Sequence, residues 1–201
     1  MATQLERSSA TREKTIEATI ACLVERGFHG VTITAVAERA GVSRGAVSHQ
    51  YPDKTLLVVD VVDEIKRRRL DEVHAVLDAA PPGRRRIEVG LDEMWRVFRD
   101  PIYLAALEVY VGARTDPELH PRVLQLEFDV DEAIREVVRA MTGPTSDPAQ
   151  AQLRADVVIN TLRGLALMYA TGAPLEPLER TWALARADTL ESLSALAAGP
   201  H

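Results

Sequence analysis

Residues 32–54 read "TITAVAERAGVSRGAVSHQYPDK". This stretch combines two amphipathic helical patterns, each too short to form a stable helix in isolation. Thr32 is a favourable N-cap for the first helix, and Gly41 is a favourable left-handed residue to end it. Ser43 then caps the second helix, and Pro52 stops it. Two short helices joined at a glycine corner predict a helix-turn-helix unit.

The second helix of this unit has a small and polar outer face. If Val47 and Tyr51 point into a core, helical spacing turns Gly45 and His49 outward. Bulky apolar side chains are absent from that face, which suits entry into a DNA major groove about 12 Å wide. A solvated helical corner without a DNA partner would have the same pattern, so the motif alone leaves both interpretations open.

The outward side chains predict direct contacts with bases. Arg44 can reach guanine O6 and N7 or a phosphate, while His49 and Gln50 can offer hydrogen bonds to base edges. The methyl group of Ala46 can touch a thymine methyl. Gly45 costs about 1 kcal/mol of helix stability relative to alanine, which is explicable if the backbone must approach DNA closely.

Other residues of the unit are suited to holding phosphates without reading sequence. Helix N-termini attract anions, and a lysine adds full charge at the start of the next helix. The predicted DNA-binding residues are therefore Thr32, Thr34, Ser43, Arg44, Gly45, Ala46, Ser48, His49, Gln50 and Lys54.

The rest of the chain also has helical periodicity between proline and glycine breakers. No alternating strand pattern, repeat or low-complexity tract occurs, so the predicted fold class is all-α with nine helices. The predicted helices cover about residues 11–26, 32–40, 43–51, 53–79, 82–99, 101–115, 118–141, 148–171 and 176–197.

Composition limits the class of protein. Of 201 residues, 46% are hydrophobic and 27% charged, an ordinary globular balance. The chain has one cysteine, no apolar N-terminal signal, and no uncharged stretch longer than the 12 residues 164–175. We therefore expect a soluble cytoplasmic protein without membrane association. The net charge is −6, but residues 1–54 carry seven Lys and Arg against six Asp and Glu, which is compatible with DNA binding by that part.

One longer pattern is more specific than the helix-turn-helix alone. Residues 28–45 follow F-(x)3-T-(x)3-V/I-A-x-x-A-G-V-S-x-G, and an aromatic-Pro-x-Lys sequence then starts a long helix. Over residues 11–57 the chain resembles the TetR family of bacterial transcriptional regulators. Relatives commonly have an aromatic residue where this chain has Ser48, and often histidine where it has Gln50, so operator preference cannot be transferred from them.

The resemblance implies a fold and a function. It implies a helix-turn-helix DNA-binding domain over residues 9–69, with the motif at 32–51, and a regulatory and dimerisation domain over 70–201. It implies a homodimer that binds a palindromic operator and usually represses transcription, located in the bacterial cytoplasm and nucleoid-associated when DNA-bound. A small effector bound in the C-terminal domain is expected to release the DNA.

The last two helices are the predicted dimer interface. Small residues there permit close approach of helices, and two copies would form a four-helix bundle. The same stripes also arise from packing inside one subunit, but the resemblance favours an interface. The predicted interface residues are Leu153, Val157, Gly164, Leu165, Met168, Leu178, Trp182, Ala185 and Leu193.

The middle helices contain most of the scarce aromatic residues and are the predicted effector site. Largely apolar pockets with a few polar groups are the usual small-molecule sites, so we expect a largely apolar effector. The same residues would also suit an ordinary core. The candidate ligand-binding residues are Met94, Trp95, Phe98, Tyr103, Leu107, Tyr110 and Phe128.

Other chemistry has little support in the sequence. The motifs of phosphate-binding loops, serine hydrolases and dinucleotide-binding folds are absent, so we predict no enzyme activity, no catalytic residues and no cofactor. His120, Glu127 and Asp131 share a helix face, but surface charge explains them, and we predict no metal site. A helical enzyme and a helical ligand carrier that has lost DNA binding are the alternative functions.

Overall fold

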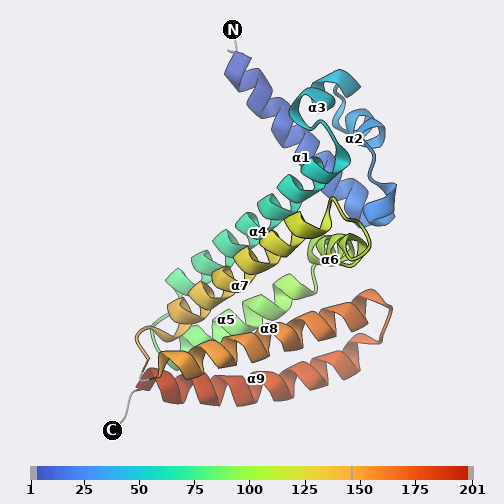
Figure 1. Ribbon diagram of the computed structural model, residues 1–201. Helices are drawn as coiled ribbons and strands as arrows, with labels where there is room; N and C mark the ends of the chain where they lie inside the picture. Colours follow the sequence, from blue (N-terminus) through green and yellow to red (C-terminus); the bar gives the residue numbers. More distant parts are fainter. Residues whose placement is uncertain (1–3, 146, 199–201) are drawn as a thin grey trace. The chain divides into compact units, whose positions relative to one another are not determined.

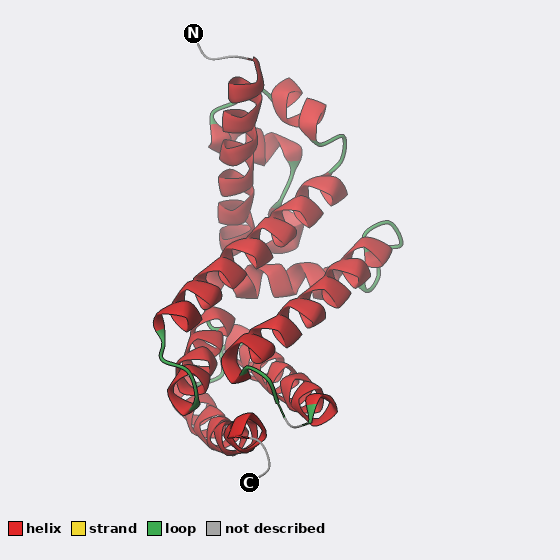
Figure 2. Cartoon of the chain, turned by 90° about the vertical axis from the view of Figure 1, so that its left-hand side faces the viewer, coloured by secondary structure: helices red, strands yellow, loops and turns green. Residues whose placement is uncertain are grey.

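The computed structural model describes residues 4–145 and 147–198 of the chain. Those residues are helical throughout, with short connections and no strand, which confirms the predicted all-α class (Figures 1 and 2). None of the helices in this part of the chain is long and apolar enough to cross a membrane. The helices are α1 (Gln4–Gly30), α2 (Ile33–Ala40), α3 (Arg44–Gln50), α4 (Lys54–Ala79), α5 (Arg84–Phe98), α6 (Pro101–Ala113), α7 (His120–Thr142), α8 (Pro148–Ala170) and α9 (Leu175–Ala198).

Helix α1 differs most from its predicted form. It begins at Gln4, seven residues before the predicted start at Thr11, and it continues through a kink at Gly27, where φ is 65° and ψ is −178°. The helical spacing of Ile16, Ile20, Leu23 and Val24 in the sequence predicts one inward stripe that includes Val24 and leaves Cys22 outside it. In the structure Val24 is 43% exposed and Cys22 is buried, so this prediction is wrong.

The buried face of α1 includes two threonines, which is why a purely apolar pattern misplaces it. The Thr15 hydroxyl donates to the Thr11 carbonyl at 2.8 Å, and the Thr19 hydroxyl donates to the Thr15 carbonyl at 2.7 Å. These bonds satisfy the hydroxyl groups within the helix, so threonine can occupy the core beside Ile16 and Leu23.

By their contacts the residues divide into two compact units, and the unit boundaries fall inside α4, between α5 and α6, and inside α7. The first unit contains the chain up to Ile65 together with Pro101–Leu126. Its core is one apolar cluster, to which α1, α2, α3, the first half of α4, α6 and the start of α7 contribute. Val36, Val47 and Leu57 are completely buried in that cluster, so α2, α3 and the following α4 each have an anchor there.

The second unit contains Lys66–Asp100 and the chain from Glu127 onward. In it α5 packs against α8 and α9, and α8 packs against α9. The indole rings of Trp95 and Trp182 stack with centroids 5.6 Å apart. Three ion pairs also join α5 and its C-cap Arg99 to α9, with N···O distances of 2.6 to 3.1 Å: Arg84–Glu191, Asp92–Arg186 and Arg99–Glu179.

The corner between α2 and α3 depends on the left-handed backbone of Gly41. Its φ is 66° and its ψ is 32°, and the N–H of Val42 donates to the Ala37 carbonyl at 3.1 Å. A Cβ atom at Gly41 would meet no neighbour within 4 Å, so the cost of a side chain there is conformational.

We predict that Gly41→Ala lowers the free energy of unfolding by about 1 kcal/mol, because an L-residue is strained in this conformation. Urea denaturation at fixed protein concentration measures the change. Gly45→Ala is the matched control, since Gly45 lies in helical backbone within α3 and the same methyl should there stabilise the fold. Equal effects from the two substitutions would contradict the backbone explanation.

Candidate nucleic-acid interface

Side-chain caps fix the starts of both helices in the helix-turn-helix. The Thr32 hydroxyl accepts a hydrogen bond from the Ala35 N–H at 3.1 Å. The Ser43 hydroxyl accepts one from the Ala46 N–H, also at 3.1 Å. Thr32 and Ser43 are exposed, so each hydroxyl can still donate to a phosphate while it holds its helix.

Helix α3 points its side chains as the helical spacing predicts. Val47 is completely buried and Tyr51 is nearly so. Arg44, Gly45 and His49 are exposed. Of the other predicted contacts, Thr34 is exposed, whereas Ala46, Ser48 and Gln50 are partly buried.

Gly45 has no packing reason to be glycine. The atom nearest to a Cβ built at this position is the Ser43 hydroxyl oxygen, at 3.9 Å, which is ordinary contact. The protomer therefore has room for a side chain here. A glycine on an exposed helix face, with free space around it, is consistent with close approach of another molecule to the backbone.

The ammonium group of Lys54 has partners inside the first unit. It donates a hydrogen bond to the Phe28 carbonyl at 2.6 Å and lies 3.9 Å from the centroid of the Phe28 ring. Burial lowers the pKa of Lys54 below its ordinary value. The sequence predicts a phosphate contact for this lysine and gives no sign of the bond to Phe28, whose carbonyl lies 26 residues away in the chain.

Gln50 is also engaged within the protein. Its amide nitrogen donates to the backbone carbonyl of Ser8 at 3.0 Å, and its amide oxygen is enclosed by protein and has no hydrogen-bond partner among the described side chains. The predicted role of Gln50 at base edges requires an accessible and unengaged amide group, so this arrangement favours a role inside the unit.

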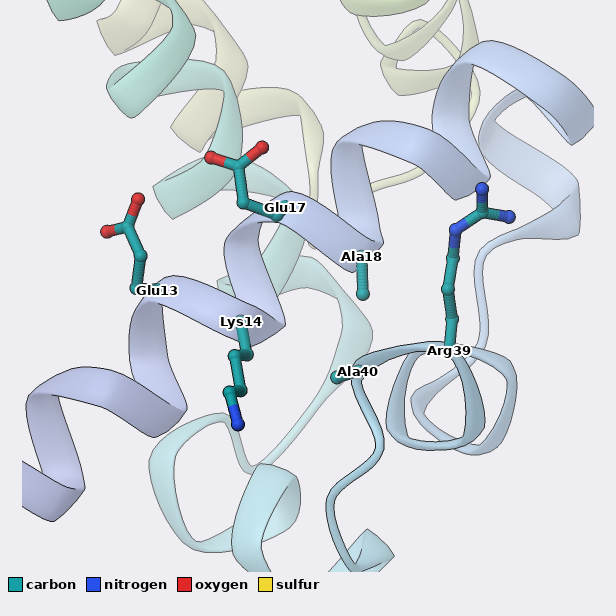
Figure 3. Close-up of a pocket in the computed structure, with 6 residues that line it drawn as sticks. All are labelled: Glu13, Lys14, Glu17, Ala18, Arg39 and Ala40. Atoms are coloured by element: carbon teal, nitrogen blue, oxygen red, sulfur yellow. The ribbon is translucent and has the colours of Figure 1, made fainter.

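A shallow hollow lies between α1 and α2 and encloses about 370 Å³ (Figure 3). Glu13 and Glu17 point away from Lys14 in this view, and the Arg39 guanidinium is paired with Glu25 through bonds of 2.6 Å. Mixed charge makes the hollow a poor phosphate site. Its lining residues are Glu13, Lys14, Glu17, Ala18, Arg39 and Ala40.

The predicted effector residues fall into both units. Met94, Trp95 and Phe98 are buried on α5 in the second unit. Phe128, in the same unit, is 58% exposed and therefore lies outside its core, contrary to the core position expected for a pocket residue. The remaining three, Tyr103, Leu107 and Tyr110, are partly buried on α6 in the first unit.

The predicted interface residues separate into an exposed and a buried set. Those on α8 are mostly exposed: Leu153, Val157, Gly164 and Met168 recur at helical spacing with Leu167, which is exposed too. We call these five residues the α8 stripe.

The other predicted interface residues lie inside their own subunit. Leu165, Leu178, Trp182 and Leu193 are buried, and Ala185 is partly buried. The prediction that the four buried residues face a second copy is therefore wrong, because periodicity alone does not separate the inner face of a helix from an apolar outer face. Leu184, which the prediction omitted, is 68% exposed on α9.

The carboxylates considered for a metal have a cation as their partner. The Arg163 guanidinium bridges Glu127 at 2.6 Å and Asp131 at 3.2 Å. Burial raises the pKa of Glu127, while Arg163 opposes that shift. Among the residues that the structure describes, no group of three His, Cys, Asp or Glu side chains could hold a metal ion.

Comparison with known proteins identifies the family. Residues 16–61 match the family described as "Bacterial regulatory proteins, tetR family". The chain is 31% identical to the HTH-type transcriptional regulator CymR of Pseudomonas putida, over 94% of this chain and 92% of that protein. It is 28% identical to the HTH-type transcriptional repressor AcnR of Corynebacterium glutamicum, over 86% and 89% of the two chains.

A solved structure extends the likeness to the whole fold. The transcriptional regulator FadR of Bacillus subtilis, in complex with stearoyl-CoA, superposes with a TM-score of 0.63. The alignment covers 94% of this chain and 99% of that one, at 13% identity, so it establishes the fold alone. The match over α1 to α4 and the full-length likeness to CymR together show that the chain belongs to the TetR family of DNA-binding transcriptional regulators.

Proposed function

We propose that the protein is a ligand-responsive repressor that binds a palindromic operator as a homodimer, in the bacterial cytoplasm. The main support for the proposal is the exposed face of α3. Its most telling residue is Gly45, because packing within the protein does not require a glycine at this position. We assign base contacts to Arg44, Ala46, Ser48 and His49, and phosphate contacts to Thr32, Thr34 and Ser43. The helix-turn-helix DNA-binding domain is proposed to cover residues 9–69, and the regulatory and dimerisation domain residues 70–201.

Dimerisation is proposed through the α8 stripe together with the exposed Leu184 of α9. A palindromic site needs two copies of α3 about 34–36 Å apart, one per half-site. The stripe offers four exposed apolar side chains at helical spacing along a long helix, and larger exposed apolar patches are typical of interaction sites.

The proposed effector is a largely apolar small molecule bound by aromatic residues of the regulatory part. FadR of Bacillus subtilis, which shares this fold, is known in complex with stearoyl-CoA, and AcnR is named as a repressor. The name of AcnR supports a repressor, and the stearoyl chain of the FadR ligand supports an effector with a large apolar part. The ligand would act by biasing two arrangements of the dimer, with a coupling of about 1–3 kcal/mol.

Gly45→Ala tests the proposed groove contact by having opposite effects on folding and binding. We expect the free energy of unfolding to rise by up to about 1 kcal/mol, because alanine favours a helix more than glycine does. We expect binding to the operator to weaken, because the new methyl stands between the backbone and the DNA.

The measurement is a fluorescence-anisotropy titration with duplexes selected from random sequence, repeated at several salt concentrations. The unchanged protein should show sequence-specific binding that weakens with salt. If Gly45→Ala stabilised the fold and left operator binding unchanged, the groove contact would be wrong. Only sequence-blind binding by the unchanged protein would favour the ligand-carrier alternative.

A further inference from the structure

Few buried side chains within α3 itself fix the orientation of this helix. It comprises only seven residues, Arg44–Gln50, and Val47 is its only completely buried side chain. A helix this short is not stable alone, and one apolar anchor allows it to pivot. Reading base edges requires side chains held to within about 0.5 Å, so other contacts must fix the helix.

Tyr51, at the C-cap of α3, supplies one such contact. Its ring is buried, and its hydroxyl donates to Oδ2 of Asp60 on α4 at 2.5 Å. Burial, aided by Asp60, raises the pKa of Tyr51 above its ordinary value, so the hydroxyl remains a protonated donor at physiological pH. The end of α3 is thereby tied to α4.

Asp60 connects this bond to α1. The Arg12 Nη2 atom donates to both oxygens of the Asp60 carboxylate, at 2.8 and 2.9 Å. A single carboxylate thus accepts bonds from the C-cap of α3 and from the first half of α1. The Asp60 side chain is partly exposed, so solvent screens the ion pair, and its value lies in geometry more than in stability.

Gln50 makes the third tie, one residue before Tyr51. Its amide nitrogen is bonded to the Ser8 carbonyl of α1, and its amide oxygen is enclosed by protein. The amide nitrogen of Gln50 is therefore occupied by a solvent-exposed bond within the unit, and its amide oxygen is not accessible to a ligand. We call these five residues the α3 clamp: Ser8, Arg12, Gln50, Tyr51 and Asp60.

We propose that Gln50, Tyr51 and Asp60 are positioning residues for DNA reading, which set the angle of α3 through the clamp without contacting bases. The inference rests on the proposed function of α3 as the reading helix. It assigns Gln50 a role opposite to that of a base reader. It also gives a role to the turns of α1 that precede Thr11, because these turns carry the Ser8 carbonyl that Gln50 binds.

A positioning residue and a base reader differ in one measurable way. Loosening α3 weakens binding to every operator variant by a similar factor, whereas removing a base contact changes which base pair is preferred. The test is therefore the affinity of Gln50→Ala for a panel of operators with single base-pair changes. His49→Ala is the matched control, because His49 is the exposed neighbour of Gln50 on the same helix.

We expect Gln50→Ala to weaken binding to all operators of the panel by roughly tenfold, the scale of one or two hydrogen bonds, and to leave their ranking unchanged. His49→Ala should change the ranking. A changed ranking with Gln50→Ala would overturn the proposal, as would unchanged affinity for the whole panel.

Tyr51 and Asp60 are tested as a pair. Tyr51→Phe keeps the buried ring and removes only the hydroxyl, so it should fold, and Asp60→Ala should weaken operator binding at least as much. Because both act through one bond, the double variant should bind little worse than Asp60→Ala alone. Additive losses would show that Tyr51 and Asp60 act independently, and a loss of thermal stability without loss of operator affinity would show that the clamp is merely structural. Either result would overturn the proposal.

Hydrogen exchange separates the failure of this inference from failure of the proposed function. The α3 amides should exchange faster in Tyr51→Phe than in the unchanged protein, with or without DNA. If the unchanged protein bound no operator specifically, the proposed function would fail. If the α3 amides exchanged at the same rate in Tyr51→Phe as in the unchanged protein, the clamp would be refuted, whatever the result for DNA binding.

Discussion

Gly27→Ala should lower the free energy of unfolding by about 2–4 kcal/mol and abolish operator binding near physiological temperature. Two costs combine. With φ at 65° and ψ at −178°, Gly27 occupies a backbone region open essentially to glycine alone. A Cβ atom there would also lie 2.2 Å from a Glu108 carboxylate oxygen, so the Glu108 side chain would have to move and give up the bond that it accepts from the N–H of Phe28 at 3.2 Å. Thermal and urea unfolding of the purified variant measure the loss.

Glu108→Ala separates the two costs. In the Gly27→Ala background it removes the collision but leaves the strained backbone, so it should recover part of the lost stability. In the unchanged background it should destabilise, because the Phe28 N–H loses its acceptor. Failure of the double variant to recover any stability relative to Gly27→Ala alone would show that the collision is relieved by movement of the Glu108 side chain.

The position of Phe28 is the reason why we expect this kink to affect DNA binding. Glu108 of α6 accepts its N–H, and Lys54 at the start of α4 donates to its carbonyl. Its ring also packs close to the backbone of α6, where a Cβ atom at Gly112 would lie 3.0 Å from a ring carbon. The turn after Gly27 thus joins α1, α4 and α6 around one residue, and disturbing it disturbs the support of the helix-turn-helix.

Local signals in the sequence predict the helix-turn-helix closely. Thr32, Gly41 and Ser43 act through hydrogen bonds within a few residues, so their types and spacing suffice to locate the helix ends. The inward position of Val47 follows from helical period in the same way. For this reason the predicted motif at residues 32–51 agrees with α2 and α3.

Contacts between distant residues could not be predicted. The bond from Lys54 to Phe28 spans 26 residues and that from Gln50 to Ser8 spans 42, and neither residue type indicates its partner. The sequence alone therefore predicts DNA contacts for both Lys54 and Gln50. The sequence also does not predict that α1 begins at Gln4, because residues 4–10 lack an apolar stripe.

The regulatory part is the least predictable from sequence. Trp182 and Leu193 look like interface residues because they lie on an apolar stripe, yet the stacking of Trp182 on Trp95 places that stripe inside the subunit. Only the tertiary structure separates them from Leu153 and Val157, which are apolar and exposed.

Val157→Glu should convert the proposed dimer to a monomer and weaken operator binding by about 100-fold or more, because each α3 then binds its half-site without the other. Val157 lies in the α8 stripe and is 49% exposed, so a glutamate at this position is solvated in a single protomer. In a dimer the same carboxylate would be buried against apolar side chains or against its own copy, which is costly. The fold of the protomer should therefore survive, with helical content unchanged by circular dichroism. Sedimentation equilibrium measures the mass, and anisotropy measures the affinity for the operator.

Val111→Glu is the matched control, since it places the same charge at an exposed valine of α6, 59% exposed and outside the α8 stripe. That variant should remain a dimer and bind the operator as the unchanged protein does. A Val157→Glu protein that stays dimeric at micromolar concentration would show that the subunits pair through another surface. A monomer with undiminished operator affinity would show that pairing does not contribute to DNA recognition, because the loss is expected only if the two half-sites are bound by physically linked copies of α3.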